Sequence, residues 1–432
     1  MENRVLMIAY HYPPNRGSSG SLRTLNFTRH LPRYGWNPAL LTVHARAYPE
    51  TSADQCADIP AGMPLHRAFA LDASRHLALS GRYPGWIALP DRWISWIVAG
   101  VPAGMSMISK YRPRVIWSTY PIATALWIGY LLHRLSGLPW VTDFRDPLTE
   151  VDPRTGQRHP PGKSLWRARR AIEQHAVEHS ARTVLVTPGA RRIYAERYER
   201  VPDSHWAVIP NGYEEETFAA VEPLVHRPPL AGRPIQLLHS GFLYPTPDRD
   251  PTAFFMALSS LKASGKISPS QVNVTLRASG FDEHYRDLIR QHELEDMVRL
   301  VPAVSYRDAL KEMLSADGLL VFQGYTSNPA VPAKLYEYLR ARRPILAMVD
   351  ADGDTAATLR SAGAGIIIPL EFSEQIAYAL LQFLGQIQEG TTPTANESIV
   401  RSFARESRAA DLATLFDRVV LDANKKSTRA KK

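Results

Sequence analysis

The sequence predicts an α/β protein made of two doubly wound, Rossmann-like halves with a cleft between them. Three observations lead to this prediction. Short apolar runs typical of buried strands alternate with amphipathic runs typical of helices along nearly the whole chain. The 432 residues exceed the length of an ordinary single domain. The series also pauses at the turn Asn211-Gly212 and resumes at Ile235, and the acidic, then proline-rich stretch between them, 214–234, is predicted to be a linker.

The first half opens with a strand, a glycine-containing loop, a helix and a second strand. We expect the strands over residues 5–9 and 38–43 and the helix over 21–34, which together form a βαβ unit. Gly17 and Gly20 lie in the loop, where a missing side chain lets the backbone approach a ligand closely. The loop lacks G-x-G-x-x-G, so it is no dinucleotide fingerprint, and a plain surface loop explains it about as well.

Two long runs without charged residues, 93–109 and 115–132, come close to the length of a membrane span. The second run divides at Pro121 into a strand over 115–119 and a helix, so we reject a span there. The first run contains Pro102 between two glycines and is expected to be a buried helix flanking the sheet. The alternative is an exposed apolar segment, because tryptophans favour a membrane interface and three lie nearby: Trp86, Trp93 and Trp96.

Charged residues follow the strand predicted over 139–143. Asp143, Arg145 and Asp146 stand at its carboxyl end, where α/β proteins bind their ligands. We therefore name these three as candidate catalytic residues. An ion-pair lock on the backbone would give the same pattern.

The second half begins with a strand over 235–241, followed by a loop that carries Arg249. Further strands are predicted over 272–277, 298–301, 318–322 and 365–369, with helices between them. Residues 350–354 are rich in aspartate but do not match a calcium loop, and we predict an ordinary loop there.

The most informative stretch is 331–347. Pro332 opens a helix whose apolar face is Leu335, Tyr338 and Leu339, and a strand follows Pro344. Lys334 and Glu337 share a face near the start of that helix, where backbone N–H groups attract phosphate. A lysine for phosphate and a carboxylate for ribose hydroxyls suit a nucleoside diphosphate. The alternative is a surface Lys–Glu pair, which is common on helices.

Composition narrows the protein class. One cysteine excludes a disulfide framework and a multi-cysteine metal site, and the first ten residues lack the apolar region of a signal peptide. The net charge of +9 is uneven: residues 1–212 carry 26 basic and 15 acidic side chains, a net of +11, whereas residues 213–432 carry 25 and 27, a net of −2. A basic first half suits an anionic membrane surface or nucleic acid, although a solvated surface explains it too. No nucleic-acid-binding motif is present, so nucleic acid is not expected.

Several short blocks, taken in order, resemble the GT-B glycosyltransferases, most closely the bacterial family 4 group of retaining sugar-nucleotide transferases. The blocks span nearly the whole chain: residues 12–23, 140–147, 209–213, 240–251 and 334–344. The resemblance implies an acceptor-binding domain at 1–212 and a nucleotide-sugar-binding domain at 213–395. It also implies that a last helix, 396–422, packs back on the first domain, and we expect a basic disordered tail at 423–432.

The resemblance also assigns roles to residues. Lys334 and Arg249 match cations that meet the donor diphosphate, and Glu337 matches the ribose-binding glutamate. Gly241 belongs to the same donor side. The base would lie near Pro302, and Gly17 and Gly20 near the phosphates and the reacting sugar. Two departures stand out: Pro329 occupies the place of a first glutamate common in relatives, and the strand that ends at Asp143 lacks the histidine they often have.

The expected function is therefore transfer of a sugar from a nucleoside-diphosphate sugar to a glycan or lipid-linked acceptor in cell-envelope or exopolysaccharide synthesis. The reaction is expected to retain the configuration of the transferred sugar and to need no metal and no cofactor. The protein is expected to be cytoplasmic and peripheral on the inner face of the membrane. The alternatives are a non-catalytic GT-B subunit that binds a nucleotide or glycan, and a GT-B sugar-nucleotide epimerase.

Overall fold

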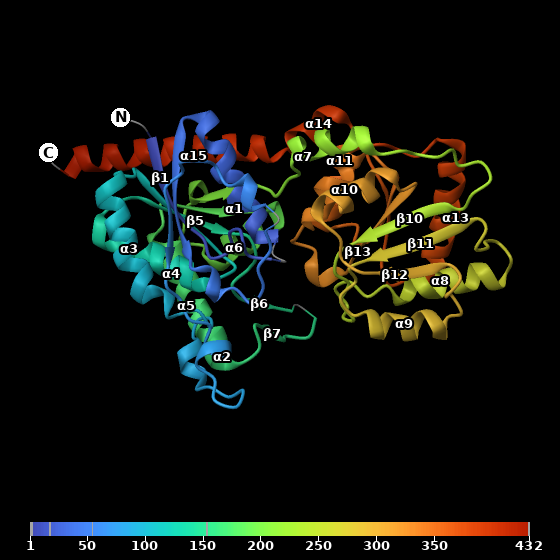
Figure 1. Ribbon diagram of the computed structural model, residues 1–432, viewed down its shortest axis with the longest axis horizontal. Coiled ribbons are helices and arrows are strands. Elements are labelled where there is room, and N and C mark those ends of the chain that lie inside the picture. Colours follow the sequence, from blue (N-terminus) through green and yellow to red (C-terminus); the bar gives the residue numbers. More distant parts are fainter. Residues whose placement is uncertain (1–2, 17–18, 54, 153, 431–432) are drawn as a thin grey trace. The chain divides into compact units, whose positions relative to one another are not determined.

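The computed structural model describes residues 3–16, 19–53, 55–152 and 154–430. The chain divides into two compact units (Figure 1). The first domain consists of Met1–Asn211 and Arg405–Lys432, and the second of Gly212–Ala404.

A seven-stranded parallel sheet forms the centre of the first domain, in the order β3-β2-β1-β4-β5-β8-β9. Its strand order reverses between β1 and β4, which lie side by side with Val5 opposite Val115. In such sheets ligands bind at the carboxyl ends of the strands beside this reversal. The strands are β1 (Asn3–Ile8), β2 (Trp36–Val43), β3 (Leu65–Ala68), β4 (Val115–Thr119), β5 (Trp140–Phe144), β8 (Arg182–Leu185) and β9 (Trp206–Val208).

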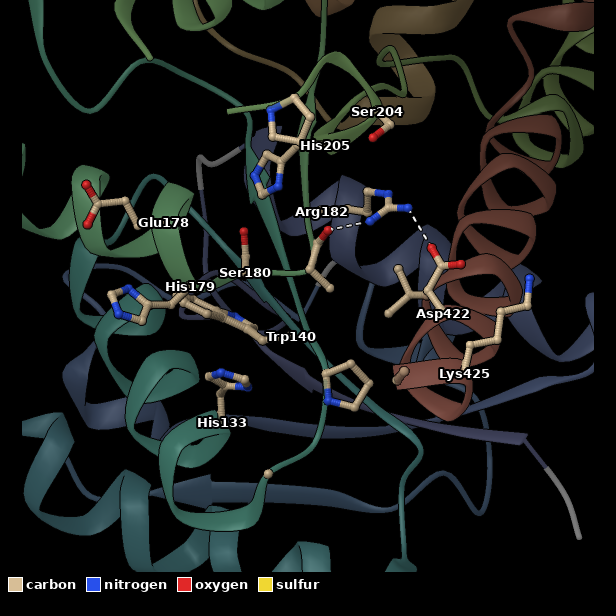
Figure 2. A pocket seen from close by; sticks show the side chains of 16 residues that line it. His133, Trp140, Glu178, His179, Ser180, Arg182, Ser204, His205, Asp422 and Lys425 are labelled. Atoms are coloured by element: carbon tan, nitrogen blue, oxygen red, sulfur yellow. Dashed lines mark hydrogen bonds and ion pairs between the residues drawn. The ribbon is translucent and has the colours of Figure 1, made fainter. Parts of the chain in front are cut away.

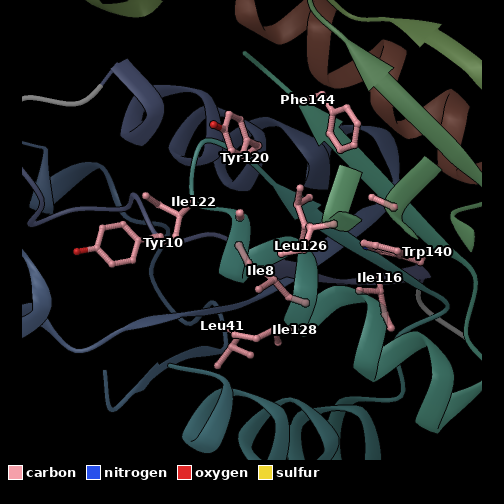
Figure 3. Close-up of a cluster of buried hydrophobic side chains, with 14 of the residues drawn as sticks. Ile8, Tyr10, Leu41, Ile116, Tyr120, Ile122, Leu126, Ile128, Trp140 and Phe144 are labelled. Carbon is pink, nitrogen blue, oxygen red and sulfur yellow. The ribbon is translucent and has the colours of Figure 1, made fainter. Parts of the chain in front are cut away.

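Helices cover both faces of this sheet. On one face α1 (Ser19–His30) packs beside α15 (Arg405–Ala430), so the last helix completes the core of the first domain. The other face carries α3 (Trp96–Tyr111), α4 (Ala123–Ser136), α5 (Lys163–His179) and α6 (Pro188–Arg197). Figure 3 shows the apolar cluster between that face and its helices.

Glycines bring α3 close to α4. A Cβ at Gly100 would lie 2.8 Å from Cδ1 of Ile128, and one at Gly104 would lie 2.4 Å from Cδ1 of Leu132. The uncharged run 93–109 is therefore mostly a helix that flanks the sheet with one buried face, and Val98 lies on its exposed side. In the described part of the chain no helix is long and apolar enough to cross a membrane.

Three small elements complete the first domain. The helix α2 (Ala73–His76) lies in the 49–90 segment, and the strands β6 (Glu150–Val151) and β7 (Arg158–His159) form a short antiparallel pair after β5.

A six-stranded parallel sheet forms the centre of the second domain, in the order β12-β11-β10-β13-β14-β15. Here the reversal lies between β10 and β13. The strands are β10 (Ile235–Ser240), β11 (Val272–Arg277), β12 (Val298–Val301), β13 (Gly318–Gln323), β14 (Ile345–Val349) and β15 (Ile366–Ile368).

Two apolar clusters flank the second sheet, one on each face. One contains α8 (Thr252–Ala263), α9 (Asp282–Gln291) and α13 (Ser373–Glu389). The other contains α7 (Glu215–Val221), α10 (Tyr306–Ser315), α11 (Ala333–Ala341), α12 (Asp354–Ala362) and α14 (Glu397–Ser402). The predicted fold class, two Rossmann-like parallel-sheet domains, is confirmed.

The structure corrects three expectations. The stretch after Gly212 is not only a linker, because α7 forms there: glutamates suit the start of a helix, and Phe218 and Val221 are buried. The last helix does not begin at 396, since α14 belongs to the second domain and α15 begins at Arg405. The tail is not disordered through its length, because α15 continues to Ala430. Residues after Leu421 include no Gly or Pro and several strong helix formers, which lets the helix propagate.

Candidate functional site

Lys334 lies at the strand reversal of the second domain. It is the second residue of α11, which follows β13, and its side chain reaches toward the end of β10. Pro332 is the N-cap of α11 rather than its first helical residue. The predicted apolar face of the helix is buried: Leu335, Tyr338 and Leu339. A second contact fixes the helix to the sheet, because the Ser240 N–H donates a hydrogen bond to Oη of Tyr338 at 2.8 Å.

The Lys334 amine is held by His239, a buried residue of β10. The two nitrogens, Nζ of Lys334 and Nε2 of His239, are 3.0 Å apart. No salt bridge to Lys334 occurs among the residues that the structure describes. Burial first, and then the Arg249 cation, lower the pKa of Lys334 to about 7, while Glu337 acts in the opposite direction.

Gly241 makes room for this amine. Its φ of +120° is in the region that favours glycine, and a Cβ there would lie 2.7 Å from Nζ of Lys334. Any side chain at this position would therefore displace the cation.

Glu337 is nearly buried and is held by the tyrosine that opens α10. The Tyr306 hydroxyl lies 2.9 Å from Oε1 of Glu337 and donates to it. A carboxylate in a fixed orientation suits an acceptor for sugar hydroxyls. The predicted pair of Lys334 and Glu337 thus comes together at the start of one helix, with different partners.

Arg249 lies in the loop between β10 and α8. It forms an ion pair with Asp248 at 3.3 Å, and its guanidinium stands 5.2 Å from the centre of the Tyr244 ring. The loop is fixed against the end of β13, because Gly324 N–H donates to the Asp248 carbonyl and a Cβ at Gly324 would collide with the Pro247 carbonyl. The positive charge of Arg249 also acts on Lys334 and lowers the pKa of its amine.

Aromatic side chains surround this loop. Phe242 stacks on Tyr244 with ring centres 6.2 Å apart, and Tyr244 meets the edge of Phe281 at 6.3 Å. All three are exposed. Phe242 lies over Gly280, where a Cβ would be 2.1 Å from the ring. These flat surfaces at the ends of β10 and β11 are of a kind on which a planar ring can stack.

Pro302 lies in the exposed loop after β12. Its carbonyl accepts a hydrogen bond from Arg277, the last residue of β11, which also forms an ion pair with Glu312. The loop that the sequence assigns to the base is thereby tied to the neighbouring strand.

In the first domain, Asp143 is fully buried, and both oxygens of its carboxylate accept hydrogen bonds from other side chains. Arg23 donates to both of its oxygens, at 2.8 and 3.1 Å, and Thr119 donates to Oδ2 at 2.8 Å. Arg23 also donates to the carbonyls of Ile209 and Pro210, each at 3.0 Å. The ion-pair lock, which the sequence left open as an alternative, describes Asp143 best. A substrate has no access to this carboxylate in the described arrangement.

Arg145 and Asp146 lie beyond Asp143, and His11 joins them from the loop after β1. Asp146 is exposed, whereas burial lowers the pKa of Arg145 and Asp146 partly offsets this. Burial and then the Arg145 cation lower the pKa of His11 to about 3, so this imidazole is neutral. Its Nδ1 is buried and has no hydrogen bond in the part of the chain that the structure describes. The ends of β1 and β5 therefore bring together a cation, an exposed carboxylate and a neutral histidine.

Of the two glycines predicted in the first loop, Gly17 and Gly20, the structure describes Gly20. Gly20 is buried in the first turn of α1. Gly17 lies outside the described residues.

Comparisons with known proteins bear on the family and the fold. Residues 20–212 match the family profile described as a Glycosyl transferase 4-like domain. The match lies within the first domain except for its last residue. None of the curated proteins matches the sequence.

Solved structures show that the glycosyltransferase fold extends over the whole chain. Sucrose-phosphate synthase from Thermosynechococcus elongatus has a TM-score of 0.62 at 13% identity, with 99% of both chains covered. HepE from Anabaena, in complex with UDP and glucose, has 0.59 at 13%, with 99% of both covered. The lipopolysaccharide outer core galactosyltransferase WaaB has 0.60 at 11%, with 95% of this chain and 99% of that chain covered. The predicted GT-B fold is confirmed.

A separate pocket of about 690 Å³ lies in the glycosyltransferase 4-like domain and α15 (Figure 2). It is at the amino ends of β5, β8 and β9, opposite the edge that holds Asp143, and contains none of the predicted site residues. Two of the lining side chains, Arg182 and Asp422, bond to each other at 2.7 Å, and a third, His205, bonds to the buried Thr183 at 2.9 Å. In the described ranges no group of three or more His, Cys, Asp or Glu side chains could hold a metal ion.

Two histidines near the predicted site residues were not predicted from the sequence. His239 lies inside an apolar strand and looks like a core residue, and His11 follows a strand in a loop read mainly for its glycines. The available signal was position, because each stands at or near the end of the first strand of its domain.

Proposed function

We propose that this protein is a glycosyltransferase that moves a sugar from a nucleoside-diphosphate sugar to an acceptor. One observation carries the proposal: the buried Lys334 amine stands at the strand reversal of the second domain, beside Arg249 and the start of α11, without a salt bridge in the described chain. Such a place is prepared for an anion. That HepE was solved with UDP and glucose supports a nucleotide sugar as that anion.

Donor cleavage leaves a nucleoside diphosphate that gains negative charge as the glycosidic bond breaks. Lys334, Arg249 and the N–H groups that open α11 stabilise this charge. Glu337, oriented by Tyr306, accepts from the ribose hydroxyls. The base lies near Pro302, at the sheet edge where Phe242 and Phe281 are exposed.

We assign acceptor chemistry to the first domain. Asp146 is the exposed carboxylate that orients the acceptor hydroxyl, and Arg145 and His11 shape its surroundings. Asp143 is a positioning residue, because its carboxylate joins Arg23 and holds the loop from β5 in place. Gly20, in the first turn of α1, is assigned to the surface that approaches the reacting sugar, and the same role for Gly17 stays a prediction from the sequence.

We further propose that the reaction proceeds with retention and without a metal, since the cations at the donor site supply the neutralisation that a divalent ion would give. Product anomer analysis by NMR tests retention. Unchanged transfer in the presence of EDTA tests the second point, and activity restored only by added Mg²⁺ or Mn²⁺ would contradict it.

The proposed acceptor is a glycan or lipid-linked saccharide of the cell envelope, met at the cytoplasmic face of a membrane. Segment 69–98 supports this, because it holds five exposed large apolar side chains: Phe69, Leu77, Leu79, Trp86 and Val98. Trp96 is buried and Trp93 mostly so, so the tryptophan that faces solvent is Trp86. Exposed arginines in the same segment, Arg75 and Arg82, suit anionic head groups.

Liposome flotation tests the membrane surface. Vesicles containing anionic lipid should carry the protein upward in a salt-sensitive manner, and Trp86→Ala with Leu79→Ala should weaken this. Equal flotation with neutral vesicles, or none at all, contradicts it.

The function itself is tested with a thermal-shift screen against UDP, GDP, ADP and dTDP sugars, followed by a transfer assay with the donor that stabilises most. Release of nucleoside diphosphate that depends on Lys334 is the expected result. Tight binding without hydrolysis or transfer would favour the non-catalytic subunit, and an epimerised donor would favour the epimerase.

A further inference from the structure

His239 has a protonation state that its neighbours determine. Its Nδ1 lies 2.9 Å from the Leu320 carbonyl on the adjacent strand β13. A carbonyl only accepts, so Nδ1 carries the hydrogen and Nε2 has a free lone pair. Burial, and then the Lys334 and Arg249 cations, keep the pKa of His239 well below its usual value. The imidazole is therefore a neutral, fixed acceptor.

That lone pair is directed at Lys334. Nε2 of His239 lies 3.0 Å from Nζ, so the amine donates to the ring. Gly241, two residues further along the chain, confines the amine from a second side, because a Cβ there would lie 2.7 Å away. Both constraints come from β10 or the residue after it, which makes the position of Nζ a property of that strand.

The charged and titratable groups around Lys334 come from four places. His239 lies on β10, and Arg249 lies on the following loop with its partner Asp248. Glu337 lies on α11 itself and is hydrogen-bonded to Tyr306 of α10. Tyr338, also on α11, bonds to the Ser240 N–H. Arg249 opposes a charge on Lys334 and Glu337 favours it, but no carboxylate in the described chain forms a salt bridge with the amine.

From this arrangement we infer that His239 is a positioning residue for the Lys334 amine, and that binding of a nucleotide sugar places a proton on that amine. The inference rests on the proposed function of the site. The proton comes from water or buffer and joins the amine lone pair, giving an ammonium that faces the diphosphate. No bond to the ligand forms.

Binding is expected to take up a proton rather than release one because of the signs of the charges around the amine. Burial and Arg249 lower the pKa of Lys334 to about 7 in the empty site, so at about pH 8 most molecules carry a neutral amine. A diphosphate brings negative charge to the amine and raises that pKa again. Binding at this pH should therefore take up about one proton.

Calorimetry with UDP-glucose, GDP-mannose, ADP-glucose and dTDP-glucose tests this, because the diphosphate of a nucleotide sugar does not titrate near neutral pH. Titrations at about pH 8 in two buffers of different ionisation enthalpy count the protons. We expect uptake of about one proton by the wild type, and affinity that falls as pH rises through the Lys334 pKa. The Lys334→Arg variant, charged throughout, should bind with no uptake.

Two variants separate the role of His239 from simple packing. In His239→Leu the acceptor is gone, and the pH at which affinity falls should move down by about one unit. His239→Gln keeps an acceptor and should return the profile to near the wild-type position. Identical profiles for the two variants would show that the acceptor does not matter and would overturn the positioning role.

The outcomes distinguish this inference from the function on which it rests. Binding of a nucleotide sugar by the wild type with no proton uptake, and with affinity constant across neutral pH, overturns the inference and leaves the donor site standing. If the protein binds none of the four nucleotide sugars, both the inference and the proposed donor site are overturned.

Discussion

Arg23 in the first domain and Lys334 in the second are both cations at the carboxyl edge of a parallel sheet, but their charges are balanced differently. Arg23 donates to both oxygens of Asp143 and to two backbone carbonyls. Lys334 has a neutral imidazole as its hydrogen-bond partner and another cation, Arg249, nearby.

The difference separates a structural ion pair from a binding group. A buried pair whose donors and acceptors are satisfied gains nothing from a ligand and loses much if either partner is removed. A buried amine without a counter-charge destabilises the empty domain, and an arriving anion removes that cost. Arg23 therefore stabilises the fold, whereas Lys334 is suited to bind an anion.

The largest effect is expected on stability, when the ion pair between Arg23 and Asp143 is broken. Asp143→Asn leaves Arg23 buried without its counter-charge and should cost about 3–5 kcal/mol of unfolding free energy. Urea denaturation measures this. Asp203→Asn is the matched control, because its pair with Arg191 is exposed and should be worth less than about 1 kcal/mol. Equal losses for the two variants would contradict the structural role of Asp143.

Removal of the Lys334 amine should lower activity. Lys334→Met removes a group that stabilises the leaving diphosphate and should lower kcat by roughly 100- to 1,000-fold. Steady-state transfer with the donor found by screening measures it. A kcat within threefold of the wild type would remove Lys334 from the mechanism.

The next largest effect is expected on the KM for the donor. Glu337→Gln weakens hydrogen bonds to ribose hydroxyls from charge-assisted to neutral and should raise the donor KM about tenfold or more. Tyr306→Phe, which only releases the Glu337 side chain, should raise it a few-fold. If Tyr306→Phe costs as much as Glu337→Gln, the tyrosine does more than orient the carboxylate.

The smallest effect concerns stability and pH. The pKa of Lys334 is about 7 in the folded protein and near 10.5 when unfolded, so the unfolded chain binds more protons between these values and wild-type stability rises with pH across them. Lys334→Met should therefore raise Tm by a few degrees below pH 7, with the gain shrinking toward pH 10.5. Thermal melts at several pH values check this. A gain that grows with pH would mean that the amine is not destabilising.

The sequence was sufficient for the fold and for the donor residues because those signals are local. The strands β4, β11 and β12 lie at their predicted positions, β4 as a mainly apolar run and β11 as alternating apolar and polar residues. Lys334 and Glu337 are three residues apart on one helix. Asp143 shows the limit. Its position at a strand end is visible in the sequence, but its partner Arg23 is 120 residues away, so a lock and a catalytic acid look alike.

Other residues were missed for related reasons. The role of His239 depends on a carbonyl of another strand and a lysine 95 positions later. The edge strand β3, Leu65–Ala68, has only four residues, and the two in its middle are polar. The helix α7 lies in an acidic stretch that resembles a linker. Long-range pairing decided each of these cases.

The most direct test of the central claim is calorimetric titration of the stabilising nucleotide sugar into the wild type, Lys334→Met and Lys311→Met. Lys311 is a surface residue of the same domain, paired with Asp308. We predict that Lys334→Met weakens binding about 100-fold or more and that Lys311→Met stays within twofold of the wild type. Equal affinity of Lys334→Met and the wild type would contradict the assignment of the second-domain strand reversal as the donor site.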